Sequence, residues 1–170
     1  MEDRGVGAPA RMLRTTQCSA NARLVCEPVT VDDAESPPVE IHEITFDAVN
    51  PHGLAQFWAS LLERQIRPGD MPADDSVLVL ERPGQPGLLF LRVPQSKTAK
   101  NRVHFDLWPT GTTRDGQVER ALELGATLLA DRRQPDGRGW VVLADPEGNE
   151  FCIGSSAAER EARRARAGHE

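Results

Sequence analysis

Apolar and polar residues alternate near position 45 of the sequence. Ile44 and Phe46 are interleaved with Glu43, Thr45 and Asp47. A period of two residues is typical of a β-strand that has one face buried and one face exposed to water or to a cavity. We therefore predict a strand over 40–48, which ends before Asn50-Pro51 because proline cannot donate a ladder hydrogen bond.

A helix and further strands are predicted after this point. Apolar residues recur at intervals of three and four from Leu54 to Leu62, which predicts an amphipathic helix of about 12 residues. Two strands are predicted over 76–81 and 87–93, separated by a Pro- and Gly-rich turn, and a short strand around 65–67 completes the unit.

The same order of elements is predicted a second time. A strand over 102–108 is followed by a helix that contains Val118 and Leu124, with Gly125 just after it in the left-handed conformation that ends helices. Three strands follow over 127–132, 139–143 and 150–153, with a turn at 145–148 between the last two. Two successive βαβββ units are therefore expected, which indicates an internal duplication.

The chain divides into three parts by composition. Residues 1–38 contain no sustained apolar period, and we expect a disordered leader that ends at Pro37-Pro38. Residues 39–155 form the expected domain. Residues 156–170 form a charged tail in which arginines alternate with Glu and Ala, a pattern that favours a solvated helix over a binding patch.

Charge and cysteine usage narrow the range of partners and compartments. A net charge of −6 and a pI near 5.3 argue against nucleic acid, whose phosphates require clustered Lys and Arg. No apolar run approaches the roughly 20 residues that span a bilayer, and no secretory signal begins the sequence. Three cysteines fit no zinc or redox spacing, so we expect reduced thiols and a cytoplasmic protein that contacts no membrane.

Three segments resemble the glyoxalase-like branch of the vicinal oxygen chelate superfamily, the glyoxalase/bleomycin resistance/dioxygenase proteins. They are Phe57-Trp58 with Leu61-Leu62, the run Lys100–Leu107, and Trp140–Cys152 with its Asp-Pro-Glu-Gly-Asn turn. The resemblance implies an α+β fold in which two βαβββ modules form an incompletely closed eight-stranded barrel with the helices outside. Many members of this branch are bacterial, and open barrels of this kind often pair along their edges, which implies a homodimer.

Polar residues share one face of three predicted strands, while the opposite face is apolar. Because burying many ionisable groups in a packed core is costly, we expect this polar face to border a ligand-binding cavity. Among the tryptophans, Trp58 is expected in the core and Trp108 at the cavity. The candidate cavity residues are Glu43, Asp47, His104, Asp106, Trp108, Glu150 and Cys152.

Metal-using members of the family take His or Glu ligands from four strands. The present sequence matches only some of these ligand positions. Glu43 and His104 match two ligand positions, and Glu150 is a substitute for a third. The fourth predicted strand offers only Arg92, and Cys152 occupies the position of the usual last carboxylate. The sequence thus predicts either no metal or a divalent ion on Glu43, His104 and either Glu150 or Cys152. The candidate ions are Zn²⁺, Ni²⁺, Mn²⁺ and Fe²⁺, and Zn²⁺ or Ni²⁺ is favoured if the thiol takes part.

Three functions fit the sequence. The incomplete ligand set favours a metal-free protein that binds or sequesters a small molecule. The alternative is a metal-dependent lyase, isomerase or dioxygenase that chelates its substrate through neighbouring oxygens. The third is a structural or regulatory module that uses residues 1–38 to bind a partner.

Overall fold

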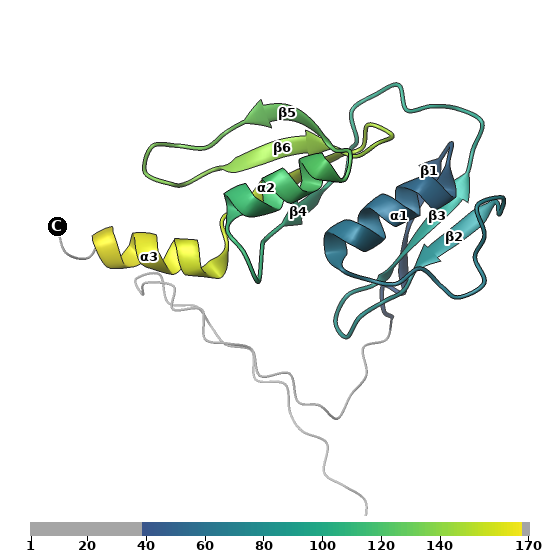
Figure 1. Ribbon diagram of the computed structural model, residues 1–170, viewed down its shortest axis with the longest axis horizontal. Helices are drawn as coiled ribbons and strands as arrows, with labels where there is room; N and C mark the ends of the chain where they lie inside the picture. The colour runs from purple at the N-terminus through teal and green to yellow at the C-terminus, as the bar shows by residue number, and fades with distance from the viewer. Residues whose placement is uncertain (1–38, 168–170) are drawn as a thin grey trace, which may run out of the picture. The chain divides into compact units, whose positions relative to one another are not determined.

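The computed structural model describes residues 39–167, so the expected leader over 1–38 lies outside the described residues. Within them, strands and helices follow one another in two similar runs, coloured blue to teal and teal to yellow in Figure 1. No helix of the described part is long and apolar enough to cross a membrane. The elements are β1 (Glu43–Ala48), α1 (Pro51–Leu62), β2 (Ser76–Val79), β3 (Gly87–Arg92), β4 (Phe105–Leu107), α2 (Arg114–Glu123), β5 (Thr127–Asp131), β6 (Trp140–Ala144), β7 (Glu150–Gly154) and α3 (Ala157–Ala167).

The first run makes a mixed sheet in the order β1-β3-β2. β1 pairs in parallel with β3, with Ile44 opposite Leu88, and β2 pairs antiparallel with β3. Where a short strand around 65–67 was predicted, the chain makes an isolated bridge between Ile66 and Val79.

The second run makes a mixed sheet in the order β4-β7-β6-β5. β4 pairs in parallel with β7, and β7, β6 and β5 pair antiparallel in turn. The strand predicted over 102–108 is wrong at its start, because only 105–107 is extended and the side chain of Val103 is 79% exposed. The Glu150 carboxylate accepts a hydrogen bond from the backbone N–H of Asn101. This bond holds the segment that precedes β4 as a loop instead of a strand.

An aromatic cluster links the two runs into one core. Trp58 on α1 is 1% exposed, which confirms its expected place in the core. Its ring centroid lies 5.4 Å from that of Phe105 and 5.2 Å from that of Phe151, both in the second run. Phe46 on β1 also contacts Phe105 at 5.4 Å. The apolar faces of strands from both sheets therefore share one core with the helices.

The Asp-Pro-Glu-Gly-Asn turn fastens the second run to the first. The Trp58 indole N–H donates to Asp145 Oδ2 at 3.1 Å within the core. The backbone N–H groups of Val49 and Asn50 donate to the two carboxylate oxygens of Glu147 at 2.8 and 2.7 Å. The segment that the sequence predicts as a turn therefore also binds the start of α1 through carboxylate acceptors.

The fold class is α+β, as predicted, and both sheets are mixed. Gly125 follows α2 with a φ of +106°, which confirms the predicted left-handed residue. The two sheets share no hydrogen-bonded pair of strands in the described residues. The eight-stranded barrel accordingly stays a prediction.

Candidate functional site

A hollow of about 400 Å³ lies against the four-stranded sheet and is called the β4–β7 hollow below. Strands β4, β6 and β7, the segment before β6 and helix α3 all contribute to its wall. Its lining residues are His104, Asp106, Trp108, Arg138, Gly139, Trp140, Cys152, Gly154, Ser155, Arg160 and Arg163.

Strand pairing brings the polar residues of this hollow together. Asp106 of β4 lies directly opposite Cys152 of β7 in the parallel register. Successive side chains of a strand point to opposite faces, so Phe105 and Ile153 join the core while Asp106 and Cys152 point to the other face. A Cβ atom at Gly154 would lie 3.2 Å from the Trp108 ring, so the glycine lets that ring lie close to the strand.

His104, Asp106 and Cys152 each offer a ligand atom, and these three atoms lie within 4.8 Å of one another. Across residues 39–167 this is the one group of three or more His, Cys, Asp or Glu side chains so arranged. The His104 Nε2 to Asp106 Oδ1 distance of 4.0 Å is too long for a hydrogen bond. Imidazole, carboxylate and thiol together form a donor set that suits Zn²⁺ or Ni²⁺.

The Cys152 thiol is neutral at physiological pH. Burial raises its pKa to about 11, and a hydrogen bond with the Asp106 carboxylate acts in the same direction. Because the thiolate is the nucleophilic form of cysteine, this side chain is a poor nucleophile at neutral pH. Its chemistry in this state is that of a small, weakly polar wall of the hollow.

Arginines from two segments form the rim of the β4–β7 hollow. The Arg160 guanidinium carbon lies 4.1 Å from the centre of the Trp108 ring, in cation–π contact, and its Nη1 donates to the Ser155 carbonyl. Arg163 donates through Nη1 to the Gly137 carbonyl and to Ser155 Oγ, each at 3.1 Å. Arg138 binds Asp136 at 2.6 Å.

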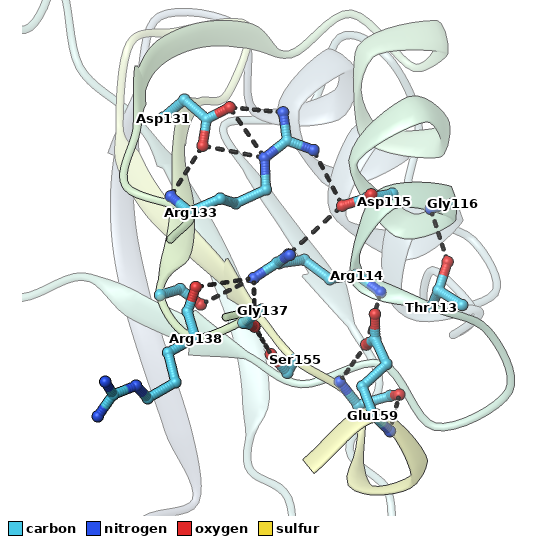
Figure 2. Close-up of polar contacts among 12 residues, drawn as sticks. Thr113, Arg114, Asp115, Gly116, Asp131, Arg133, Gly137, Arg138, Ser155 and Glu159 are labelled. Carbon is cyan, nitrogen blue, oxygen red and sulfur yellow. Dashed lines mark hydrogen bonds and ion pairs between the residues drawn. The ribbon is translucent and has the colours of Figure 1, made fainter. Parts of the chain in front are cut away.

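Helix α3 begins with a capping box, and the glutamate of that box also attaches the helix to α2. Ser156 and Glu159 exchange hydrogen bonds, with Ser156 N–H donating to Glu159 Oε2 at 2.7 Å and Glu159 N–H donating to Ser156 Oγ at 3.3 Å. The same Oε2 accepts the backbone N–H of Arg114 at 3.0 Å, so one carboxylate joins the starts of α2 and α3 (Figure 2). This contact holds Arg160 and Arg163 at the hollow.

The Arg114 side chain fixes the segment that enters β6. It is nearly fully buried, and its Nη1 donates to the carbonyls of Gly137, Arg138 and Gly139 at 3.2 to 3.4 Å (Figure 2). A guanidinium carries several N–H donors, so this one buried side chain binds three consecutive carbonyls and stabilises the irregular backbone. The segment supplies Arg138 and Gly139 to the hollow.

A second hollow of about 500 Å³ lies beside β1 and the segment that precedes β4. Asp47, His104 and Glu150 line it, together with Lys97 and Asn101. Glu150 accepts from Lys97 Nζ at 3.1 Å and from the Asn101 backbone N–H at 3.0 Å. Burial acts to raise the pKa of Glu150, but these hydrogen bonds outweigh it and the pKa lies below its ordinary value. Glu150 is therefore a paired carboxylate.

Comparison with known families decides the classification. The family model of the glyoxalase-like domain matches residues 43–154. The chain belongs to the glyoxalase-like domain family. It falls in the glyoxalase/bleomycin resistance/dioxygenase superfamily that its sequence resembles.

Solved structures agree with the fold of this glyoxalase-like domain. The fosfomycin resistance protein FosX from Mesorhizobium loti has a TM-score of 0.52 and 13% identity, over 74% of this chain and 99% of that one. A glyoxalase/bleomycin resistance protein/dioxygenase family enzyme from Burkholderia phytofirmans PsJN has a TM-score of 0.51 and 18% identity, over 68% and 97%. The oxidase ChaP-H2 has a TM-score of 0.52 and 23% identity, over 70% and 94%. No curated protein matches.

The predicted cavity residues of the glyoxalase-like domain divide between the two hollows. His104, Asp106, Trp108 and Cys152 line the β4–β7 hollow. Asp47 and Glu150 line the second hollow, which His104 also reaches. Glu43 lines neither of them and lies next to Gly87 and His42. Of the predicted metal ligands, the structure therefore brings neither Glu43 nor Glu150 into the group with His104 and Cys152.

Sequence reasoning missed the arginines of this glyoxalase-like domain. The sequence favours a solvated tail for Arg160 and Arg163, yet both are half-buried in the structure, whereas Arg164 and Arg166 are exposed. Positions three apart share a helix face, so the spacing of Arg160 and Arg163 was a usable signal. The Ser156-Ala157-Ala158-Glu159 capping box was another, because it marks the start of a stable helix.

Proposed function

We propose that this glyoxalase-like domain binds a small molecule in the β4–β7 hollow and needs no metal to do so. The observation that carries the proposal is that four side chains from β4, the residues on either side of it and β7 line one concavity of about 400 Å³: His104, Asp106, Trp108 and Cys152. A volume of this size, lined by aromatic groups and a few polar groups, is typical of ligand sites.

The other positions from which the family takes ligands support binding over metal chemistry. The family takes one ligand from the strand that corresponds to β3, where Arg92 is the only charged side chain. Its guanidinium binds the Asp75 carboxylate at 2.9 Å and the Val49 carbonyl at 3.0 Å. A paired cation cannot ligate a metal ion. Glu150 is likewise occupied by Lys97 and Asn101.

A thermal-shift screen tests the binding proposal. A panel of small molecules is added to chelator-treated protein, and a ligand present at about 100 times its Kd is expected to stabilise the fold by about 2.7 kcal/mol, a shift of roughly 5–10 °C in Tm. The shift should disappear in Trp108→Ala and persist in Met71→Ala, which removes another exposed apolar side chain, 59% exposed and outside both hollows. A shift that survives Trp108→Ala would place the ligand elsewhere.

A second candidate is a metal-dependent lyase, isomerase or dioxygenase, which the grouping of His104, Asp106 and Cys152 favours. These three side chains would hold the ion, and a bound divalent ion would polarise an oxygen atom of the substrate. Titration with Co²⁺ tests this, because thiolate ligation gives a near-ultraviolet charge-transfer band that Cys152→Ser would abolish. Absence of the band in the wild type would refute thiol ligation, and unchanged metal affinity in His104→Ala would refute the site.

We also infer that two copies form a homodimer. Edge strand β5 supports this, because Leu128 and Leu129 are each about half exposed there and strand edges readily pair. Sedimentation velocity should show a dimer that Leu128→Lys weakens. A monomer at all concentrations would contradict the inference.

A further inference from the structure

Two tryptophans are exposed within the β4–β7 hollow. Trp108 is 64% exposed and Trp140 is 49% exposed, although both line a concavity. Large aromatic surfaces left open to water are uncommon in folded proteins, and within a concavity they indicate a binding surface. Flat indole faces bind planar partners through offset stacking and edge contacts.

The rim of the same hollow is strongly cationic. Arg138, Arg160 and Arg163 line it, against a single carboxylate from Asp106. This local excess of positive charge occurs in a chain whose net charge is −6. Opposite charge focused in a concavity raises the local concentration of a small anion.

Two of these arginines keep hydrogen-bonding capacity. Within residues 39–167, neither Arg160 nor Arg163 forms an ion pair with a carboxylate, whereas Arg138 binds Asp136. The hydrogen bonds that Arg160 and Arg163 make in this part of the chain run through Nη1 to oxygens of Ser155, Gly137 and the helix backbone. A guanidinium has five N–H donors, so the remaining donors of both groups suit a carboxylate.

We propose that the β4–β7 hollow binds a planar aromatic carboxylate, with its ring against Trp108 and Trp140 and its carboxylate on Arg160 and Arg163. The inference rests on the proposed small-molecule function and names the ligand class for that same site. Arg160 and Arg163 occupy one face of α3 three residues apart, which lets both guanidinium groups reach the same anion. Helix α3 therefore acts as the element that selects for charge.

Calorimetric titration with a matched pair of probes tests the proposal. The probes are 2-naphthoate and 2-naphthylmethanol, which share one ring system and differ in the anionic group. In the wild-type chain, 2-naphthoate should bind at least about tenfold more tightly, because a charge-assisted hydrogen bond is about twice as strong as a neutral one. Higher salt should weaken the binding of 2-naphthoate and leave the affinity for the alcohol unchanged.

Variants of the rim complete the test. Arg160→Gln and Arg163→Gln should each weaken 2-naphthoate about tenfold and leave the alcohol within about twofold. Arg164→Gln is the matched control, because it removes the same charge from the same helix outside the hollow, and it should leave both affinities unchanged. Trp108→Ala should weaken both probes alike.

The outcomes separate the ligand class from the proposed function. If both probes bind the wild type equally, the anion proposal is overturned while small-molecule binding stands. If neither probe binds, the aromatic-carboxylate proposal is overturned, and the thermal-shift screen decides separately whether the hollow binds any small molecule. If the preference for 2-naphthoate survives in both glutamine variants, or falls equally in Arg164→Gln, the assigned arginines are wrong.

Discussion

Glu159→Ala should release α3 from the domain while leaving the core folded. No residue of α3 is fully buried, so its attachment depends on polar contacts. Glu159 Oε2 accepts two backbone N–H groups, from Ser156 at 2.7 Å and from Arg114 at 3.0 Å. At about 1 kcal/mol for each of these partly buried bonds, their loss costs about 2 kcal/mol, which is roughly a 30-fold shift toward the released helix.

Amide hydrogen exchange measures this release directly. Amides of α3 from Arg160 onward should exchange roughly 30-fold faster in Glu159→Ala, while amides of β7 keep their protection because the core is unaffected. Glu161→Ala is the matched control, because it removes the same charge from an exposed position of the same helix. Unchanged exchange in Glu159→Ala, or an equal acceleration in Glu161→Ala, would refute the reasoning.

The attachment of α3 should also depend on pH. Burial acts to raise the pKa of Glu159, but hydrogen bonds from Ser156 and Arg114 outweigh it, so its pKa lies below the ordinary value of 4.5. A lowered pKa in the folded state stabilises the attached helix above about pH 4.5, and this contribution is lost as the pH falls through the lowered value. The protection factors of the α3 amides, which correct for the intrinsic pH dependence of exchange, should fall on acidification in the wild type and change much less in Glu159→Gln.

Three further variants test other parts of the structure. Trp58→Phe should lower the free energy of unfolding by about 2 kcal/mol in urea titrations, because Asp145 loses its indole donor and a small cavity forms; a change below about 0.5 kcal/mol would contradict this. Glu150→Gln should lower the free energy of unfolding by about 1 kcal/mol near neutral pH. The difference from the wild type should shrink below about pH 4.5, because the lowered pKa of Glu150 marks a carboxylate that folding stabilises. A difference that stays constant with pH would exclude that origin. A variant in which the other two cysteines are replaced by serine isolates the reactivity of Cys152. At about pH 8 its thiol should react with a thiol reagent roughly 100-fold more slowly than a free cysteine, since its pKa is raised to about 11. Equal rates would contradict a buried neutral thiol.

Local patterns predicted most of the secondary structure. The alternation around Ile44 and Phe46 marked β1, and the spacing from Leu54 to Leu62 marked α1, because one buried face imposes a period on the sequence. Gly125 marked the end of α2 because its backbone conformation disfavours other residues. The predicted strand is absent over 102–104 because no local pattern decides this part of the chain. Whether those residues form a strand depends on a partner, and the Glu150 carboxylate binds the backbone at Asn101 instead.

The candidate site was predictable only in part. Strand parity grouped Asp106 with Cys152 on one face, because alternation is a property of the strand itself. Parity says nothing about distance between strands, and Glu43 therefore appeared equivalent to residues from which the structure separates it. The arginines of α3 were missed because their value depends on where the helix is attached.

The sequence by itself determined the order of elements, the buried faces and the family, since each of these follows from local periodicity or from motifs of adjacent residues. Only the tertiary structure decided that α3 turns back onto the sheet, because its contacts join distant segments: Glu159 binds the backbone of Arg114, 45 residues away, and Arg163 binds the Gly137 carbonyl. These long-range contacts bring Arg160 and Arg163 to Trp108 and Trp140, and no local pattern specifies them. Contacts between distant segments depend on the packing of the whole domain, and they determine the chemistry of the β4–β7 hollow.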